Sequence, residues 1–275
     1  MSDSVGVGLI GCGTIGAGLA AAVERGEAGP ARIARVFDVD PGRAGKVAVG
    51  LSSRPTPSTK LDELVSDPGV AIVVEAASQA AAASCARTVL QAGRSLLLMS
   101  SGALIDSALF KDLSDLAADR GVTLAVPSGA VGGLDAIRAV KGELRELTLT
   151  STKRPAALAG APGFAAWESK AIDRPTVVYD GPARQAVRLF PANVNVAAAV
   201  SLAGLGPDRT TARVVADPQA PGNVHEVVAS GAFGQFTLRF VNQPSAENPR
   251  TSRLAVLSAL EALRGMCSRG PRIGS

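Results

Sequence analysis

The sequence predicts an α/β protein in which a doubly wound parallel sheet is followed by a smaller α+β domain. Over the first 127 residues, short apolar runs alternate with helical stretches, which is typical of parallel strands buried on both faces. Right-handed crossovers between such strands give a doubly wound sheet. After Pro127, strand-like runs follow one another with short turns, which indicates a mixed or antiparallel sheet.

The first part of the chain contains alternating strand and helix signals. The expected strands are residues 5–10, 33–37, 70–75, 95–99 and 122–126. The expected helices are residues 17–25, 61–65, 80–92 and 107–120. Gly93 and Gly121 directly follow two of these helices and are expected to end them, because glycine tolerates the left-handed backbone that closes a helix.

The second part begins with a helix that ends at Ala139 and an alternating run, residues 145–152, that predicts an exposed strand. Residues 154–176 hold several Pro, Gly and Ala and predict a long loop or lid. Two helices and three strands follow, at residues 183–190, 193–203, 210–216, 225–230 and 235–241. We therefore expect a first domain at residues 1–127 and a second at residues 128–244. The C-terminal segment, residues 245–267, contains an amphipathic helix that is expected to pack back on the first domain.

Composition excludes several classes of protein. Hydrophobic residues make up 47% of the 275 residues and charged residues 19%, so a disordered chain or a coiled coil is not expected. Aromatic residues make up only 3%, the net charge is +4, and no stretch holds a dense block of Lys and Arg. Nucleic acid is therefore not an expected partner. No apolar run reaches the roughly 18 residues that a membrane span needs, so no membrane association is expected.

The cysteines and the N-terminal residues indicate a reducing compartment. Cys12, Cys85 and Cys267 lie far apart and form no CxxC pair, so no disulfide framework is expected. The N-terminal residues lack the basic region of a secretory signal. We expect a cytoplasmic protein that holds no metal.

A glycine-rich turn between the first strand and the first helix predicts a dinucleotide site. Residues 11–16 form a GxGxxG motif. Gly11 permits the tight turn, Gly13 lets the backbone approach a pyrophosphate, and Gly16 allows close contact between helix and strand. The N-terminus of the helix offers N–H groups to the phosphates. The residues expected to contact the cofactor here are Gly11, Cys12, Gly13, Thr14, Ile15, Gly16 and Asp38.

Asp38 is the expected reader of the adenosine ribose. It lies 22 residues after Gly16, at the end of the second strand. A carboxylate there accepts hydrogen bonds from the ribose hydroxyls and repels a 2′-phosphate, which favours NAD. Arg43 is close enough in the sequence to soften this preference, so NAD and NADP are both expected cofactors. Cys12 is interpreted as a small packing residue rather than a nucleophile.

Four further motifs resemble the L-aspartate dehydrogenase family. They are Pro-Ser-Gly-Ala-Val-Gly-Gly-Leu-Asp at residues 127–135, Phe-Pro-Ala-Asn-Val-Asn-Val-Ala at 190–197, Ala-Asp-Pro at 216–218 with Asn-Val-His at 223–225, and Asn-Gln-Pro-Ser-Ala-Glu-Asn-Pro at 242–249. The resemblance runs from the glycine motif to about residue 264. It implies an N-terminal Rossmann domain that binds the dinucleotide, followed by an α+β domain for substrate binding and dimerisation.

The resemblance also implies an activity. That activity is the reversible NAD(P)-dependent oxidation of L-aspartate, at its CH–NH2 group, to iminosuccinate. Water then converts iminosuccinate to oxaloacetate and ammonia. The implied context is NAD biosynthesis, in which iminosuccinate is a precursor of quinolinate, and the implied assembly is a homodimer.

Individual roles follow from the same resemblance. His225, the only histidine, matches the catalytic histidine of the family, while Ala130 and Asn195 match positions assigned to the cofactor. An imidazole that titrates near neutral pH suits proton transfer at an amine and at water. Apart from the resemblance, Lys153 and Arg154 follow a predicted strand and could bind the two carboxylates of a C4 substrate. Asn193 is a further candidate for substrate or cofactor binding.

Each of these roles has a structural alternative. Asn193 and Asn195 could cap the helix that follows them. The turn at residues 128–130 could be only a hinge between domains, and Lys153 and Arg154 could be solvated charges. A lone histidine is more often a surface residue or a satisfied core residue than a catalytic one.

Two other functions are kept as alternatives. One is a related Rossmann oxidoreductase that acts on another amino acid or oxo acid, because a fold does not determine a function. Against sugar dehydrogenases, residues 99–103 lack the lysine of their Glu-Lys-Pro motif, and against dihydrodipicolinate reductase the chain has a single histidine. The other alternative is a non-catalytic protein that senses NAD(H), which would be expected to carry a DNA-binding module or a basic stripe.

Overall fold

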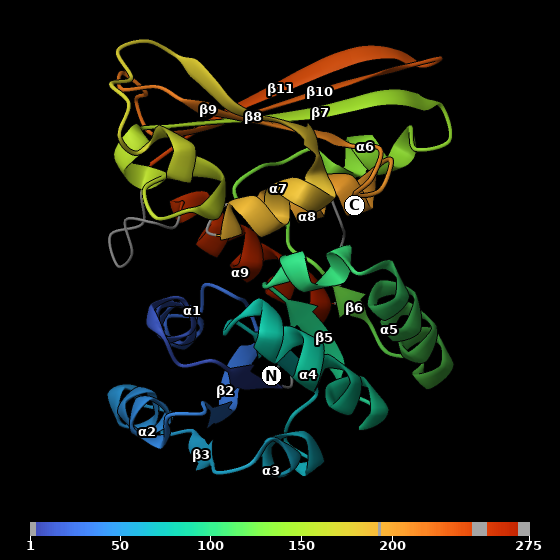
Figure 1. Ribbon diagram of the computed structural model, residues 1–275. Helices are drawn as coiled ribbons and strands as arrows, with labels where there is room; N and C mark the ends of the chain where they lie inside the picture. Colours follow the sequence, from blue (N-terminus) through green and yellow to red (C-terminus); the bar gives the residue numbers. More distant parts are fainter. Residues whose placement is uncertain (1–3, 192–193, 244–251, 269–275) are drawn as a thin grey trace. The chain divides into compact units, whose positions relative to one another are not determined.

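The computed structural model describes residues 4–191, 194–243 and 252–268 of the chain. The chain forms two compact units (Figure 1). Unit 1 comprises the chain up to Pro127 together with the C-terminal residues that begin at Val256, and unit 2 comprises residues 128–255. The chain therefore leaves unit 1 at Pro127 and returns to it in its last helix.

Unit 1 is built on a six-stranded sheet with the spatial order β3-β2-β1-β4-β5-β6. All neighbouring strands in it pair in parallel. The strands are β1 (Val5–Ile10), β2 (Ala31–Phe37), β3 (Thr56–Ser58), β4 (Ile72–Glu75), β5 (Ser95–Leu98) and β6 (Leu124–Ala125). This order is that of a Rossmann fold, in which the winding reverses between β1 and β4. The predicted doubly wound parallel sheet is confirmed.

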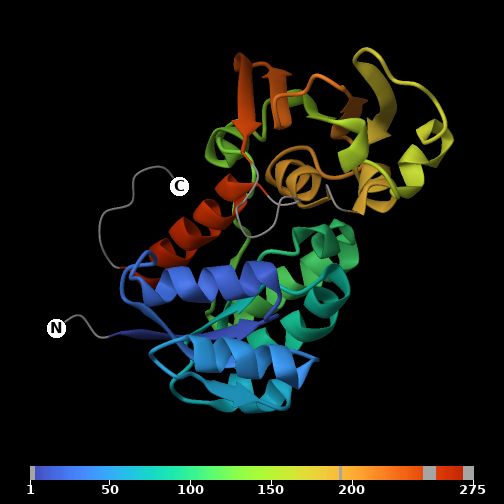
Figure 2. The ribbon, with the colours of Figure 1, turned by 90° about the vertical axis from the view of Figure 1, so that its left-hand side faces the viewer.

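Helices cover both faces of this sheet (Figures 1 and 2). They are α1 (Thr14–Glu24), α2 (Pro41–Gly50), α3 (Leu61–Ser66), α4 (Gln79–Gln91), α5 (Ser107–Arg120) and the C-terminal α9 (Arg253–Cys267), with a 3-10 turn η1 (Ser101–Ile105). Helices α1, α2 and α9 share one apolar core with β1 and β2. Leu260 and Leu263 of α9 are buried in that core, and the Arg264 guanidinium donates to the carbonyl oxygen of Glu27 at 2.5 Å. These contacts hold α9 against unit 1.

Local signals explain where several helices begin and end. The Asp106 carboxylate accepts hydrogen bonds from the N–H groups of Ala108 and Leu109 and so caps α5. Gly121 ends the same helix in the left-handed conformation, with φ at 63°. Helix α2 is absent from the sequence prediction because three of its ten residues are glycine, which lowers helix propensity. The start of α2 could have been predicted from the sequence, since Asp40 caps the helix and Pro41 occupies its first position.

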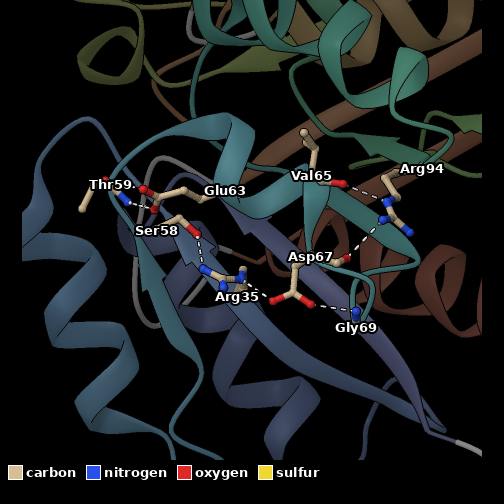
Figure 3. A network of polar contacts seen from close by, with 8 residues as sticks. All are labelled: Arg35, Ser58, Thr59, Glu63, Val65, Asp67, Gly69 and Arg94. Atoms are coloured by element: carbon tan, nitrogen blue, oxygen red, sulfur yellow. Dashed lines mark hydrogen bonds and ion pairs between the residues drawn. The ribbon is translucent and has the colours of Figure 1, made fainter.

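A polar network around Arg35 joins β2, β3 and the turn before β4 (Figure 3). The Arg35 guanidinium donates to the Asp67 carboxylate at 2.5 Å and to the Ser58 hydroxyl at 3.2 Å. The other Asp67 oxygen accepts from the N–H of Gly69 at 2.7 Å, and the Arg94 side chain donates to the Asp67 carbonyl oxygen at 3.1 Å. The hydrogen bond from Arg35 holds the pKa of the Asp67 carboxyl below its usual value. Through Arg35, this network links the edge strand β3 to the turn that precedes the central strand β4.

Unit 2 is built on a five-stranded mixed sheet with the order β11-β10-β7-β9-β8. Strands β7 and β9 pair in parallel and the other neighbours pair antiparallel. The strands are β7 (Leu144–Lys153), β8 (Thr176–Pro182), β9 (Thr211–Ala216), β10 (Asn223–Gly231) and β11 (Gly234–Asn242). Helices α6 (Leu134–Ala139), α7 (Ala183–Leu189) and α8 (Val194–Ala203) lie on one face of this sheet (Figure 1). The predicted α+β unit is confirmed.

The expectation of an exposed strand at residues 145–152 is wrong. This segment is β7, the central strand of the sheet, and its inner face is buried. The buried side chains on that face are Leu147, Leu149, Ser151 and Lys153. The alternating pattern suggested an exposed strand because two polar residues, Ser151 and Lys153, occupy buried positions at the end of the strand.

The segment expected to be a long loop or lid is more ordered than the sequence suggested. It contains two 3-10 turns, η2 (Pro155–Ala157) and η3 (Pro162–Trp167). Leu158 and Phe164 are buried in one apolar cluster with Phe190. The segment is therefore packed on unit 2, and its last residue, Thr176, already begins β8, a strand that the sequence did not predict.

No helix within the described part of the chain is long and apolar enough to cross a membrane.

Candidate active site

The predicted site residues fall into two groups, one in each unit. The glycine motif and Asp38 lie together at the carboxyl edge of the parallel sheet in unit 1. His225 and Lys153 lie on the inner face of the mixed sheet in unit 2. Asn193 and the motif residues 244–249 lie outside the described residues.

At two positions of the glycine turn in unit 1, Gly11 and Gly16, the structure leaves no room for a side chain. Gly11 has a φ of 92°, and a Cβ on it would lie 2.7 Å from the backbone of Ala76 and Ala77. A Cβ on Gly16 would lie 1.9 Å from the carbonyl oxygen of Gly11. Gly16 therefore allows helix α1 to lie close to the glycine turn itself as well as to β1.

Gly13 is different, because nothing in the chain lies within 4 Å of the place that its Cβ would occupy. Helix α1 starts directly after Gly13 without a side-chain cap. Thr14, its first residue, is exposed, whereas Ile15 packs against the core. The open space beside Gly13 and the uncapped N–H groups suit a pyrophosphate.

Asp38 lies at the end of β2 and points its carboxylate at the glycine turn. One carboxylate oxygen accepts a hydrogen bond from the Cys12 N–H at 2.7 Å, and the other accepts from the Asp40 N–H at 2.9 Å. Arg43 pairs with Asp40 at 3.4 Å and is exposed. Asp38 is thus held beside the turn where an adenosine ribose would lie, and the residues present fit a pyridine dinucleotide.

Cys12 is a packing residue, as the sequence indicated. Its side chain is buried, and burial, with a further contribution from the Asp38 charge, raises the pKa of its thiol to about 12. A thiol with that pKa stays protonated and is a poor nucleophile. Its part in a cofactor site is therefore limited to the backbone N–H that orients Asp38.

His225 in unit 2 is a buried residue of β10. Only 3% of it is exposed, and it lies opposite Ser151 on β7. The Ser151 hydroxyl is 2.9 Å from Nδ1 of the imidazole. Because Nδ1 is engaged, Nε2 is the ring nitrogen that is left to exchange a proton with a substrate.

Lys153 lies two residues beyond Ser151 on the same face of β7 and is only 6% exposed. Burial lowers the pKa of its ammonium group to about 8. Among the residues that the structure describes, no carboxylate pairs with Lys153. Arg154, by contrast, is exposed and donates to the carbonyl oxygen of Ala220 at 2.9 Å. The alternative that Lys153 is a solvated charge is wrong.

The expectation that His225 titrates near neutral pH is also wrong. Burial, and then the nearby Lys153 charge, lower the pKa of His225 to about 3. The imidazole is therefore neutral at physiological pH and can act as a base without first losing a proton. Lys153, with a pKa of about 8, is the group of this pair that titrates close to neutrality.

Ala130 is hydrogen-bonded to Asn242, a motif residue for which the sequence predicted no role. Its carbonyl oxygen accepts a hydrogen bond from the Asn242 side-chain amide at 2.8 Å. Asn242 pairs in the sheet with Asn223, two residues before His225.

Asn195 lies in the first turn of α8 and is exposed. Ala197, two residues further along α8, lines one small internal cavity together with Ser151.

The sequence analysis gave no role to three polar residues of these sites, although Asn242 begins one of the quoted motifs. Ser151 and Asn242 are the buried partners of His225 and Ala130, and Glu75 is a fully buried carboxylate at the end of β4. Glu75 carried a readable signal, because a charged residue that ends an otherwise apolar strand in a parallel sheet has to find hydrogen-bond partners. In the described part of the chain, no cluster of His, Cys, Asp and Glu is arranged to hold a metal ion.

Comparison with known proteins matches each of the two parts of the chain to a family model. Residues 11–127 match the family model of the homoserine dehydrogenase NAD-binding domain, and residues 135–266 match the model of the aspartate dehydrogenase C-terminal domain. The L-aspartate dehydrogenase of Nitrosopumilus maritimus is 41% identical over 98% of this chain and 99% of its own length. That of Methanosarcina barkeri is 42% identical over 95% of this chain and 97% of its own. The chain belongs to the aspartate dehydrogenase family.

Structural comparison agrees with this family assignment. The solved structure of aspartate dehydrogenase from Thermotoga maritima matches with a TM-score of 0.75 and 25% identity, and it covers 98% of this chain and 99% of that one. A homoserine dehydrogenase from Thiobacillus denitrificans, at a TM-score of 0.64 and 14% identity, shares the fold. The resemblance noted from the sequence motifs is confirmed. The protein is an oxidoreductase of the L-aspartate dehydrogenase type, and unit 1 is its pyridine-nucleotide-binding domain.

Proposed function

We propose that the protein catalyses the reversible oxidative deamination of L-aspartate with NAD or NADP. The observation that carries this proposal is the buried Lys153 beside the buried His225 in unit 2. A buried cation that no described carboxylate pairs with suits a substrate carboxylate, and a neutral imidazole suits proton transfer at the amine. The similarity to L-aspartate dehydrogenases over nearly the full length of the chain supports the choice of substrate.

In the proposed reaction, the hydrogen on Cα leaves as a hydride and the amine loses a proton, so that a C=N bond forms and iminosuccinate results. Water then adds to the imine carbon and ammonia leaves, which gives oxaloacetate. The nicotinamide supplies the hydride acceptor when it is bound. In this proposal the iminosuccinate is available to NAD biosynthesis.

The chain supplies binding and proton transfer. In unit 1, Gly11, Gly13 and the N–H groups of Thr14 to Gly16 hold the pyrophosphate, and Asp38 binds the ribose hydroxyls. In unit 2, Nε2 of His225 accepts the proton of the amine or of the attacking water, while Ser151 holds Nδ1. Lys153 binds one substrate carboxylate. Ala130 and Asn195 are the proposed contacts of unit 2 with the cofactor, and Asn193 is kept as a substrate contact on the motif alone.

An initial-rate screen tests the proposed activity. L-aspartate, other amino acids, and oxaloacetate with ammonia are each assayed with NAD(H) and NADP(H) by absorbance at the NADH band. We expect turnover with L-aspartate and with oxaloacetate plus ammonia. Turnover with another amino acid but not with L-aspartate would change the proposed substrate. NADH binding without turnover of any of these compounds would indicate a sensor.

Asp38→Ala tests the assignment of nucleotide choice. The substitution removes the carboxylate that would bind the ribose hydroxyls and repel a 2′-phosphate. We expect kcat/KM for NAD to fall about tenfold, the size expected for a lost charge-assisted hydrogen bond, and kcat/KM for NADP to fall less or to rise. The matched control is Asp40→Ala, which removes the carboxylate next to Arg43 instead. An unchanged NAD to NADP ratio in Asp38→Ala would mean that another residue reads the ribose.

We further propose a homodimer that forms through the open face of the sheet in unit 2. The described helices of this unit lie on the opposite face (Figure 1). Two apolar side chains of the sheet are unusually exposed, Val177 at 48% and Val241 at 44%. A sheet face of this kind is commonly covered by a second element, and a second copy of the chain supplies one. Sedimentation velocity is expected to give twice the chain mass, and a monomer at assay concentration would contradict the proposal.

The proposed location is the reducing cytoplasm. All three cysteines are unpaired thiols, and burial raises the pKa of each one. Such thiols need no oxidising compartment.

A further inference from the structure

Glu75 is a fully buried carboxylate that none of the proposed catalytic steps uses. It ends β4, where it pairs in the sheet with Ile10 of β1 on one side and Leu98 of β5 on the other. The carboxyl ends of β1 and β4 border the place where the winding of the sheet reverses, and dinucleotides bind outside that place in folds of this type. Glu75 therefore lies directly beneath the proposed cofactor site.

The carboxylate of Glu75 holds two turns at once. One oxygen accepts from the N–H groups of Ala77 and Ser78, at 2.8 and 3.1 Å, and from the Ser100 hydroxyl at 2.9 Å. The other oxygen accepts from the Ser100 N–H at 3.0 Å. The first two donors belong to the turn between β4 and α4, and Ser100 belongs to the turn between β5 and η1.

All four partners are hydrogen-bond donors, which suits an ionised carboxylate. Burial raises the pKa of Glu75, and the hydrogen bonds from Ala77, Ser100 and Ser78 oppose that rise. The Glu75 charge also acts on Cys85 of α4. Burial first, and this charge second, raise the pKa of the Cys85 thiol to about 12, so it remains neutral. Four hydrogen bonds offset the cost of burying a carboxylate without a cation.

One of these two turns also touches the glycine turn. A Cβ on Gly11 would lie 2.7 Å from the carbonyl carbon of Ala76 and from the Ala77 nitrogen. The Ala76 N–H donates to the carbonyl oxygen of Ile10 at 2.8 Å. The Ala76–Ala77 peptide that Glu75 holds is therefore packed against the turn that would hold the pyrophosphate.

We propose that Glu75 is a positioning residue for the pyridine nucleotide. Its carboxylate holds the β4–α4 and β5–η1 turns in place and so shapes the floor of the cofactor site without touching the cofactor. This inference rests on the proposed cofactor site in unit 1 and is independent of the substrate proposed for unit 2.

Glu75→Gln is the first test, because glutamine has nearly the same volume. The amide oxygen can keep three of the four hydrogen bonds, but the amide nitrogen then faces the Ser100 N–H and cannot accept from it. We expect the Kd for NADH, measured by NADH fluorescence without aspartate, to rise about tenfold. We expect kcat at saturating NAD and aspartate to stay within about twofold of wild type, because the groups in unit 2 are untouched.

The matched control is Asp67→Asn in the Arg35 network (Figure 3). It also removes a carboxylate with several hydrogen bonds from unit 1, but at the amino end of β4, away from the glycine turn. We expect both variants to lower the Tm, because each loses hydrogen bonds of a carboxylate, and we expect Asp67→Asn to leave the Kd for NADH unchanged. An equal Kd in wild type and Glu75→Gln would overturn the proposal and leave Glu75 a structural residue.

Ser100→Ala keeps the test open if Glu75→Gln does not fold. It removes only the hydroxyl donor and keeps the carboxylate and the Ser100 N–H bond. We expect a rise in the Kd for NADH of about threefold, because one of the four hydrogen bonds that hold the two turns is lost. An unchanged Kd in Ser100→Ala, with Glu75→Gln unfolded, counts against the proposal. Wild-type protein that fails to bind NADH would refute the cofactor site itself, and turnover of an amino acid other than aspartate would refute only the proposed substrate.

Discussion

His225→Ala is expected to lower kcat for L-aspartate by about 10²–10⁴-fold, the range typical of a lost general acid or base. The Kd for NADH should stay at its wild-type value, because the glycine turn and Asp38 lie in unit 1 and are untouched. His225→Asn keeps a hydrogen-bonding side chain next to Ser151 but cannot shuttle a proton, so its kcat should fall nearly as far. Steady-state rates and NADH fluorescence together separate the loss of chemistry from a loss of binding.

The matched control is Val227→Ala, which changes the next residue on the same buried face of β10. It is expected to cost about 1–2 kcal/mol of unfolding free energy and to leave kcat near wild type, since it removes only apolar contacts. Wild-type turnover in His225→Ala would remove the histidine from the mechanism. The pKa of about 3 also predicts that His225 contributes no inflection to the rate profile between about pH 5 and 9.

The parallel sheet of unit 1 was predictable because its strands are buried on both faces. Val73 and Leu97 sit in the centre of such strands, and an apolar run reports that environment directly. Helix α2 and the short edge strand β3 were missed because glycine and proline weaken the pattern there. Unit 2 was harder to read, since β7 carries Ser151 and Lys153 on its buried face. The alternation revealed the strand, but polar residues at its buried positions concealed that the strand is central.

The residues proposed for the site could be named in part from the sequence, whereas their environment could not. The sequence motifs indicated His225, but its pKa depends on burial and on the Lys153 charge, and both come from the tertiary structure. Ser151 is 74 residues away from His225 along the chain, and only strand register brings the two together. Glu75 is similar, because its partner Ser100 is 25 residues away on a different turn. Long-range pairing of this kind leaves no local pattern in a single sequence.

Lys153→Met is expected to make the protein more stable and much less active. An ammonium group held inside the protein with its pKa near 8 is destabilised relative to the unfolded chain, where the pKa is 10.5. A methionine of similar length removes this penalty, on the order of 3 kcal/mol. If Lys153 binds a substrate carboxylate, kcat/KM for L-aspartate should fall by about 10²-fold or more, mainly through KM. Lys141→Met, an exposed lysine of unit 2, is the matched control for the change in charge.

The pH dependence of Lys153→Met separates its two effects. The unfolded chain keeps the lysine proton up to about pH 10.5, while the folded chain releases it near pH 8, so the stability of wild type relative to Lys153→Met should rise between these values. Urea unfolding of both proteins measures this difference, in which the contributions of the other titrating groups, such as the buried thiols, cancel. Succinate has two carboxylates and no amine, so its inhibition constant isolates the cation: it should rise above pH 8 in wild type and show no such rise in the variant. A wild-type KM for aspartate in Lys153→Met would show that the buried lysine does not bind substrate, and the choice of a C4 dicarboxylate would then rest on family membership alone.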